Sequence, residues 1–224
     1  MSTARLVPVR APSSPDGVVL VLHGGAAREG RTTVSPAQLS VLRMVPVARR
    51  IARAGRRRLA VHRLLNSHRG WDSRTTPVMD VARALERMQD LHGDLPVALV
   101  GHSLGGRAAL LASGGDLAVR AAVALNPWLH PTDQVHGTNA RVLVVHGTDD
   151  RIARPGLSED LVRRAPDALR IGRIAVGGGR HAMLRRARTY ESLTADFVTA
   201  VLLGSGPRSE AVAAVLAGER SVEV

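Results

Sequence analysis

Short apolar runs alternate along the chain with longer segments in which apolar residues recur every three or four positions. The short runs predict strands, because continuous apolar stretches are typical of strands buried on both faces of a parallel sheet; they fall at residues 18–22, 59–61, 97–100, 121–125, 142–145 and 171–176. The longer segments predict helices at residues 46–54, 76–92, 157–164 and 187–203. This alternation predicts an α/β fold, with a mostly parallel β-sheet and helices on both faces.

The two ends of the chain lie outside this alternation. Residues 5–10 predict a short edge strand within a lead-in of residues 1–16, and residues 17–203 form the predicted α/β domain. The break Gly204-Ser205-Gly206-Pro207 begins an extension, residues 204–224, in which residues 208–217 predict a helix that docks, forms a dimer contact or frays. The segment 126–140 is too short to build a helical cap, so we expect no cap domain and an open, shallow cleft.

Composition narrows the class of protein. A chain of 224 residues suits one domain with a sizeable core, and the absence of cysteine excludes disulfides, thiolate metal ligands and a cysteine nucleophile. No apolar stretch is long enough for a signal peptide or a membrane span. We therefore expect a soluble cytoplasmic protein that is a monomer or a homodimer.

The formal net charge of +12 raises the question of a nucleic-acid partner. All 31 basic residues are arginines, however, and they are spread along the chain, which is more typical of a coding bias than of a phosphate-binding surface. One Tyr, one Phe and two Trp leave few side chains that could stack on bases. No specific nucleic-acid partner is expected.

The apolar run 97–100 ends in Gly101-His102-Ser103-Leu104-Gly105-Gly106, and a helical period begins directly after the serine. A Gly-x-Ser-x-Gly turn between a strand and a helix is typical of a nucleophile elbow. Gly101 and Gly105 lack the Cβ atoms that would collide across so tight a bend, and the strained turn exposes the hydroxyl of Ser103. A Gly-rich connection that holds an ordinary serine is the alternative.

Three further stretches follow predicted strands: His23-Gly24-Gly25-Ala26, His146-Gly147-Thr148-Asp149-Asp150-Arg151 and Gly177-Gly178-Gly179-Arg180-His181. In an open α/β sheet, loops at the carboxyl ends of the strands build the ligand site. A serine hydroxyl needs an imidazole to take its proton, and the imidazole needs a carboxylate to hold its tautomer. Serine, acid and histidine occur in this chain order, each at the end of a predicted strand.

These motifs make residues 17–203 resemble the α/β-hydrolase superfamily, and in particular its small lidless members, the dienelactone hydrolase-like proteins and minimal carboxylesterases. The resemblance implies that Ser103 is the nucleophile and His181 the base. The family pattern His-Gly-x-x-Asp with a following proline, here Pro155, selects Asp150 as the acid, and its neighbour Asp149 is the alternative. Dienelactone hydrolases use a cysteine nucleophile, so a serine at position 103 favours an ordinary ester.

The His-Gly-Gly stretch resembles the oxyanion loop of the family. The resemblance implies that backbone N–H groups of Leu104 and of Gly25 or Ala26 stabilise the negative oxygen of a tetrahedral intermediate. Trp71 and Trp128 both follow predicted strands and are candidate substrate contacts at the pocket rim, with partly buried packing as the alternative for each.

Other polar residues near the motifs have simpler interpretations. The chain has no closely spaced signature of histidines and carboxylates that would hold a metal. We therefore expect the histidines beside the motifs to support loops by hydrogen bonding; they are His23, His102 and His146. We expect neither a metal nor a cofactor. Arg107, on the predicted helix after the elbow, is expected on a solvated helix face.

The sequence thus predicts a serine hydrolase that cleaves a small or medium carboxylic ester, or a thioester, through an acyl-serine intermediate. Its expected partner is a small-molecule acyl substrate. Two other classes stay open: a catalytically inactive hydrolase-fold binding protein, and an acyltransferase or cofactor-free peroxidase that uses the same triad. Binding proteins of this fold commonly lack a member of the triad, whereas all three candidates are present in this chain.

Overall fold

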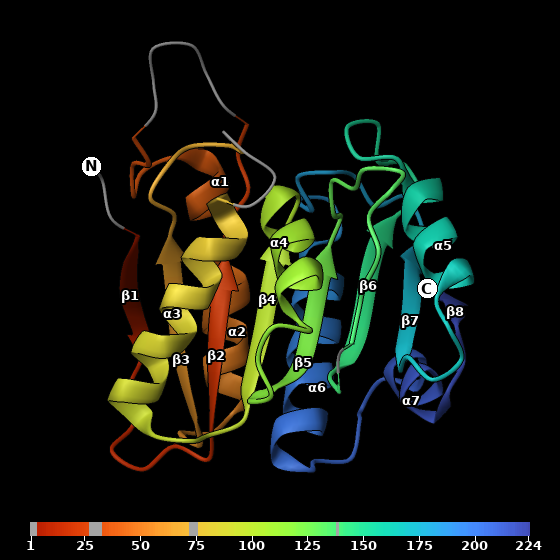
Figure 1. The fold of residues 1–224 in the computed structure, drawn as a ribbon. Helices are drawn as coiled ribbons and strands as arrows, with labels where there is room; N and C mark the ends of the chain where they lie inside the picture. Colours follow the sequence, from red (N-terminus) through yellow and green to blue (C-terminus); the bar gives the residue numbers. More distant parts are fainter. Residues whose placement is uncertain (1–3, 27–32, 72–75, 138) are drawn as a thin grey trace.

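A computed structural model of the protein describes residues 4–26, 33–71, 76–137 and 139–224. Within these residues, one sheet has the strand order β1-β3-β2-β4-β5-β6-β7-β8 (Figure 1). The strands are β1 (Arg5–Arg10), β2 (Gly17–Leu22), β3 (Leu59–Leu65), β4 (Val97–His102), β5 (Val119–Leu125), β6 (Arg141–Gly147), β7 (Ile171–Val176) and β8 (Ser221–Glu223). The pair β1 and β3 is antiparallel and the other neighbouring pairs are parallel, which confirms the predicted mostly parallel sheet.

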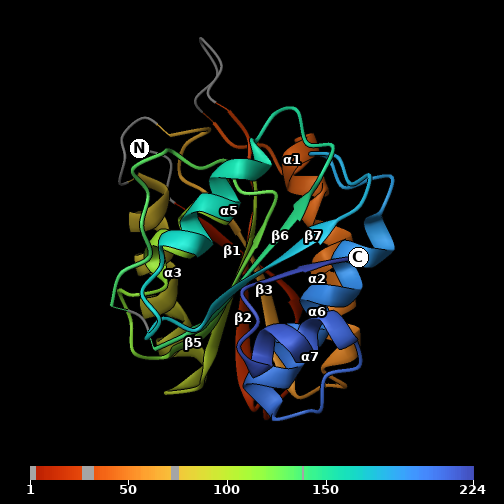
Figure 2. The same cartoon turned by 90° about the vertical axis from the view of Figure 1, so that its right-hand side faces the viewer.

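Helices cover both faces of the sheet, as predicted. They are α1 (Leu39–Leu42), α2 (Met44–Ala54), α3 (Thr76–His92), α4 (Leu104–Ala112), α5 (Pro155–Arg164), α6 (Ala187–Leu203) and α7 (Glu210–Ala217). Helices α2, α6 and α7 lie on one face, and α3, α4 and α5 on the other (Figure 2). Helix α2 begins at Met44, which places Pro46 in its first turn, where the missing N–H has no helical partner to lose.

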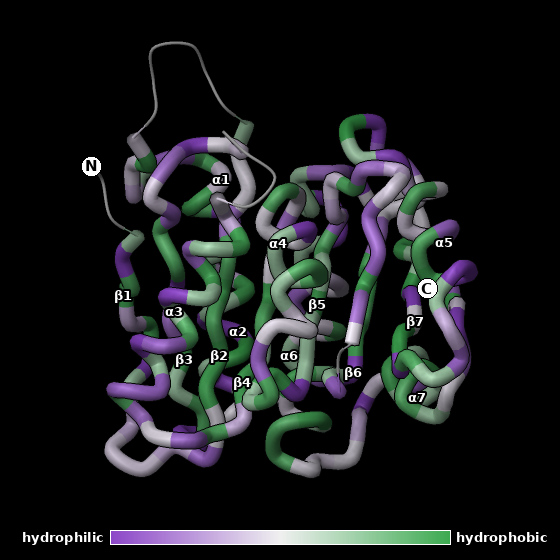
Figure 3. Tube along the Cα trace, in the orientation of Figure 1, coloured by the Kyte–Doolittle hydropathy of each residue, from purple (hydrophilic) through white to green (hydrophobic). Residues whose placement is uncertain are grey.

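The apolar core has two layers, one on each side of the sheet. Strands β2 and β4 are buried along their whole length in the middle of the sheet, and Figure 3 shows that hydrophobic residues predominate along both strands. On α6, Tyr190 and Phe197 share a helical face and are fully buried against the sheet. Because β4 lies between β2 and β5, its carboxyl end, with the Gly-Ser-Gly motif, lies centrally along one edge of the sheet.

The C-terminal segment 204–224 packs onto the rest of the molecule. Gly204 ends α6 with a left-handed φ of 65°, a conformation that favours glycine. Helix α7 then buries Val212 and Val215 in the core layer that it shares with α6. Strand β8 pairs with β7 and adds an edge strand that the hydrophobic pattern does not predict, because Val222 is the sole apolar residue of Ser221–Glu223.

Nothing in the described residues forms a cap over the carboxyl edge of the sheet. Between β5 and β6, the described part of residues 126–140 holds no helix, in agreement with the predicted lidless fold. None of the described helices is both long and apolar enough to cross a membrane.

Candidate active site

Ser103 lies at the turn between β4 and α4, with a positive φ of 55° that a residue other than glycine rarely adopts. A Cβ on Gly101 would overlap the backbone of Gly105, and a Cβ on Gly105 would lie 2.5 Å from the carbonyl oxygen of His23. The turn therefore needs glycine at both positions. Backbone hydrogen bonds hold the serine in place: its N–H donates to the carbonyl of Leu125 (3.0 Å), and its carbonyl accepts from the N–H of Trp128 (3.1 Å).

A continuous chain of hydrogen bonds joins Ser103, His181 and Asp150. Nδ1 of His181 lies 2.8 Å from Oδ2 of Asp150, and Nε2 of the same ring lies 3.0 Å from Oγ of Ser103. A carboxylate oxygen can only accept, so Nδ1 carries the proton and the Nε2 of the neutral ring accepts from the serine hydroxyl. The turn after β4 and the loops after β6 and β7 thus bring together Ser103, Asp150 and His181, the three residues that the sequence singled out.

Asp150 is buried and anchored from several directions. Its Oδ1 accepts the backbone N–H groups of Ile152 (2.8 Å) and Ala153 (2.9 Å). Burial by itself raises the pKa of Asp150, but the hydrogen bonds from His146, His181 and the backbone outweigh it and hold that pKa well below its ordinary value. The carboxylate is therefore ionised at neutral pH. The alternative acid, Asp149, is exposed and its Oδ1 accepts from the hydroxyl of Thr148 (3.3 Å).

Asn126 and His102 fix the backbone of His181. A loop-supporting hydrogen bond was predicted for His102, whereas no sequence motif indicated the role of Asn126. The amide Nδ2 of Asn126 donates to the carbonyls of Arg180 (3.0 Å) and His181 (3.1 Å). Nε2 of His102 donates to the same His181 carbonyl (2.7 Å). Burial, and then the nearby His181, lower the pKa of His102 to about 3, so its ring is neutral at physiological pH.

The acid loop and the histidine loop meet at a buried tyrosine. The hydroxyl of Tyr190 donates to Oδ1 of Asn126 (3.2 Å), and burial raises the pKa of this tyrosine to about 12. A Cβ on Gly147 would lie 2.5 Å from the same hydroxyl and would overlap the backbone of Gly179. Both glycines therefore allow the close approach that holds Asp150 beside His181.

Residues 18–223 match the model of a protein family whose description is "Alpha/beta hydrolase family". The chain belongs to the alpha/beta hydrolase family. Among solved structures, this alpha/beta hydrolase is similar to Est1E from Butyrivibrio proteoclasticus, with 14% identity, 90% of this chain and 94% of that chain covered, and a TM-score of 0.68. A second similar structure is XC6422 from Xanthomonas campestris, described as a serine hydrolase without a lid (15% identity, 87% and 93% covered, TM-score 0.64).

A third similar structure is ATU1826 from Agrobacterium tumefaciens, described as a putative alpha/beta hydrolase of unknown function (18% identity, 90% and 92% covered, TM-score 0.66). These likenesses support the fold. No curated protein matches the chain.

The candidate oxyanion donors of this alpha/beta hydrolase lie on two loops beside Ser103. Leu104 is the first residue of α4, where a backbone N–H has no partner within the helix. Gly24 packs against the serine, since a Cβ on it would lie 2.9 Å from that of Ser103. Gly25 follows with a positive φ of 120°, and the carbonyl of Ala26 accepts from Nε of Arg69 (3.2 Å).

The two other histidines beside the motifs, His23 and His146, support loops in the alpha/beta hydrolase. Nε2 of His23 accepts the backbone N–H of Asn66 (3.2 Å), and Nδ1 of the buried His146 lies 2.6 Å from the hydroxyl of Ser158. Within the described ranges, no group of three His, Asp or Glu side chains could hold a metal ion. The three histidines near the motifs therefore have partners in the fold, as the sequence interpretation expected.

Arg107 is buried, so the prediction of a solvated helix face was wrong. The side chain is 6% exposed, and its guanidinium makes two hydrogen bonds to Asp133, of 2.7 and 2.8 Å. The same guanidinium lies over the ring of Trp71, 4.4 Å from its centroid. The loop that carries Asp133 folds over α4, a contact that the helical period of α4 does not reveal. Trp71 is thus packed against Arg107, whereas Trp128 is 41% exposed.

We expect the Arg107→Met variant to lose about 3–5 kcal/mol in the free energy of unfolding, because it leaves the buried carboxylate of Asp133 without its partner. Urea unfolding measures the loss. The double variant Arg107→Met/Asp133→Leu removes both charges and should recover much of it. Arg163→Met is the matched control, since it breaks an exposed pair with Asp160 and should change stability by less than about 1 kcal/mol. Equal losses in both single variants would contradict the prediction.

Proposed function

We propose that the protein is a serine hydrolase that cleaves a small or medium carboxylic ester, or a thioester, through an acyl-serine intermediate. The hydrogen-bonded chain from Ser103 through His181 to Asp150 is the observation that carries this proposal. Each of the three side chains has the partner that its role requires. The retained triad also argues against the binding-protein alternative.

In the first half of the reaction, Oγ of Ser103 attacks the carbonyl carbon of the ester while Nε2 of His181 takes the hydroxyl proton. The carbonyl π electrons move to oxygen and form a tetrahedral intermediate. When this intermediate collapses, the bond to the leaving alcohol breaks and His181 returns the proton to that oxygen. The products of this half are the free alcohol and an acyl group esterified to Ser103.

In the second half, a water molecule replaces the alcohol. Nε2 of His181 takes a proton from the water, whose oxygen attacks the acyl carbon. Collapse of the second tetrahedral intermediate breaks the bond to Oγ of Ser103, and the imidazolium protonates that oxygen. The acid product leaves and the enzyme returns to its starting protonation state.

Asp150 contributes through charge and orientation in both halves. Its carboxylate is ionised and accepts from Nδ1 of His181, so it selects the tautomer whose Nε2 is free to act as a base. When the ring becomes an imidazolium, the negative charge 2.8 Å away stabilises it. Asp150 keeps no proton during the cycle.

The backbone N–H of Leu104 and that of Gly25 or Ala26 are the proposed donors to the intermediate oxygen. They lie on the two loops that flank Ser103, and a preorganised donor of this kind contributes about 3–4 kcal/mol to the transition state. Arg69 supports this assignment, because its hydrogen bond to the carbonyl of Ala26 restrains the loop.

Exposed apolar side chains near the triad support an apolar acyl or alcohol group in the substrate. Ile152 and Leu184 are each 66% exposed and follow Asp150 and His181 closely in the sequence. The N–H of Trp128 donates to the carbonyl of Ser103, which places this exposed residue next to the elbow. We assign the substrate contact to Trp128 and a packing role to Trp71.

A fluorophosphonate probe tests the proposal, since it phosphonylates an activated serine. We expect stoichiometric labelling of the native protein at Ser103, and no labelling of the Ser103→Ala variant. Ser113→Ala is the matched control: Ser113 is buried but donates to the carbonyl of Leu110 (2.8 Å), so its loss should leave labelling intact. Mass spectrometry of the digested protein locates the adduct.

Folded protein that stays unlabelled would overturn the proposal in favour of the binding-protein alternative. Turnover is followed with p-nitrophenyl acetate and with methyl ferulate, because a structure of Est1E has ferulic acid bound. Labelling with transfer of the acyl group to an added alcohol in preference to water would favour the acyltransferase alternative.

A further inference from the structure

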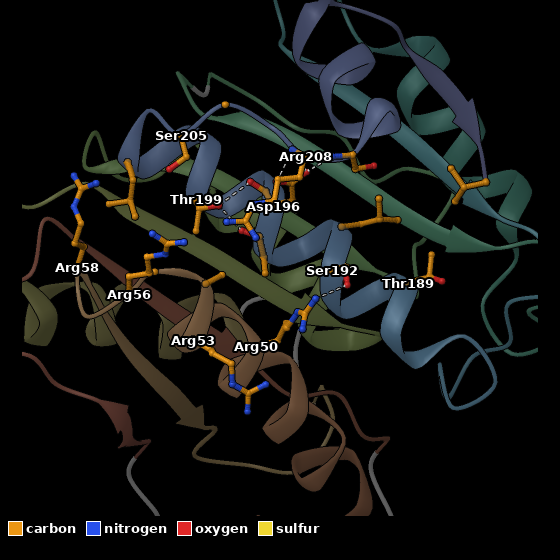
Figure 4. A pocket seen from close by; sticks show the side chains of 18 residues that line it. Arg50, Arg53, Arg56, Arg58, Thr189, Ser192, Asp196, Thr199, Ser205 and Arg208 are labelled. Carbon is orange, nitrogen blue, oxygen red and sulfur yellow. Dashed lines mark hydrogen bonds between the residues drawn. The ribbon is translucent and has the colours of Figure 1, made fainter.

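A cavity lies between α2 and α6, near the start of α7, and its lining includes none of the three triad residues (Figure 4). Its volume of about 790 Å³ falls in the range of small-molecule sites in proteins. The walls come from α2 and the turn before β3 on one side, and from α6 with the segment before α7 on the other. The proposed ester hydrolysis does not use this cavity.

The lining of this cavity is strongly basic. Five arginines contribute to it: Arg50, Arg53, Arg56, Arg58 and Arg208. Arg58 pairs with Asp16 outside the lining. For the other four, no carboxylate lies within ion-pair distance among the described residues. The five arginines are exposed, so water and salt screen part of their mutual repulsion, and a bound anion would relieve the rest.

Asp196 has the acidic side chain of the described lining, to which the terminal residue Val224 also contributes, and the backbone already engages the carboxylate of Asp196. It accepts the N–H groups of Arg208 (3.0 Å to each oxygen) and Ser209 (2.8 Å) at the start of α7. This arrangement holds the segment before α7 against α6. The charge of Asp196 is directed at these amides, so the guanidinium groups across the cavity keep an excess of positive charge.

Two arginines are directed across the cavity from the side of α2. Nη2 of Arg50 donates to Oγ of Ser192 on α6 (3.0 Å), which leaves the proton of that hydroxyl for another acceptor. Arg56 reaches toward α6 in Figure 4 from a turn in which its own φ is 46°. Residues other than glycine rarely adopt a positive φ, so the fold of the turn holds the backbone of Arg56 in a conformation that it would not prefer by itself.

The lining also indicates which kind of anion fits. It contains no aromatic side chain among the described residues, so bases have nothing to stack on, whereas the hydroxyls of Thr189, Ser192 and Ser205 add hydrogen-bond donors. Guanidinium groups with hydroxyl donors suit phosphate oxygens. The cavity is half open to solvent, and its limited volume suits a compact ligand that carries a few phosphate groups.

We propose that the cavity between α2 and α6 binds a compact small molecule with two or more linked phosphate groups. Inorganic polyphosphate and the polyphosphate group of a nucleotide share this chemistry. Binding orders the arginines around the anion and links α2 to α6, the helix that follows the loop of His181. The site is independent of the proposed hydrolase activity.

Calorimetric titration of the full chain with inorganic tripolyphosphate tests the site, at a constant ionic strength of about 0.15 M so that screening is the same throughout. We expect one site per chain and an affinity at least tenfold above that for orthophosphate. At a concentration about a hundred times the Kd, tripolyphosphate should raise the Tm by about 5–10 °C. ATP at equal concentration distinguishes a free polyphosphate from a nucleotide, since tighter binding of ATP would assign the latter.

Paired variants separate a built site from a general effect of charge. Arg50→Gln/Arg56→Gln should weaken tripolyphosphate binding at least tenfold, whereas Arg83→Gln/Arg170→Gln, which removes two exposed arginines outside the lining, should change it less than twofold. An equal loss in both variants would overturn the proposal, as would no binding by the unchanged protein. Tighter binding of a 20-nucleotide single-stranded DNA than of tripolyphosphate would also overturn it.

Discussion

Replacing His181 with alanine is expected to lower kcat for p-nitrophenyl acetate by about 10⁴-fold or more while the protein stays folded. The reason is the position of Nε2, 3.0 Å from Oγ of Ser103, where it is the proposed base for both halves of the reaction. Loss of the histidine in a comparable triad removes most of the rate enhancement. Steady-state kinetics gives kcat, and circular dichroism together with the Tm shows whether the fold is kept.

His136→Ala is the matched control, since His136 is exposed on the segment between β5 and β6, and we expect its kcat to stay within about twofold of the parent.

A comparison of the two adjacent aspartates tests the acid separately. Asp150→Asn should lower kcat by about 10⁴-fold, because the amide can hold the wrong tautomer of His181. Asp149→Asn should have little effect, because its exposed side chain contacts Thr148 instead. The reverse order would assign the role of the acid to Asp149.

The Gly101→Ala variant is expected to lose about 3 kcal/mol or more in the free energy of unfolding. Its new Cβ would overlap the carbonyl of Gly105 and lie 2.7 Å from the backbone nitrogen of Gly106. These are backbone atoms of the first turn of α4, so they cannot move aside as a flexible side chain would, and overpacking of this kind costs several kcal/mol. For a domain of this size the Tm should fall by about 6–12 °C, as measured by calorimetry.

Gly156→Ala is the control for this substitution. Gly156 lies in α5, where a Cβ would meet nothing within 4 Å, so alanine should stabilise the helix by about 0.5–1 kcal/mol. An unchanged Tm for Gly101→Ala would show that β4 and α4 do not approach as closely as the elbow requires. Fluorophosphonate labelling of the same variant reports whether the orientation of Ser103 survives the change.

The elbow could be predicted because every signal that defines it is local. A buried strand, two glycines, a serine and a helix with an apolar period all lie within 97–112, and the need for a glycine at each position follows from the sterics of one tight turn. The alternation of strands and helices is similarly local, and it determines the sheet and the two helical layers. Hydrophobic periodicity is sufficient for these features.

Which of the two aspartates, Asp149 or Asp150, contacts His181 does not follow from such local signals. Two adjacent loop residues differ in the direction of their side chains, and hydrophobic periodicity does not distinguish them. In the structure, Asp150 turns inward to the backbone N–H groups of Ile152 and Ala153, whereas Asp149 faces solvent. The resemblance to the family pattern His-Gly-x-x-Asp favours Asp150, and the geometry adds the physical reason.

Features that depend on contacts between distant segments escaped the sequence entirely. Asn126 holds the backbone of His181 although the two residues lie far apart in the chain, and β8 is a strand because β7 offers it a free edge. Arg107 is buried because two separate segments, one after β3 and one after β5, place Trp71 and Asp133 around it. The hydrophobic pattern of a single segment carries no information about which distant residues that segment will contact.

The sequence by itself determined the α/β architecture, the elbow around Ser103 and the strand-end loops that supply His181 and an aspartate, because each rests on periodicity or on the sterics of neighbouring residues. The tertiary structure decided which aspartate meets the imidazole, what clamps the histidine loop and where the arginines gather. These depend on the approach of segments that are remote in sequence, so they are set by packing and long-range hydrogen bonds once the sheet has formed.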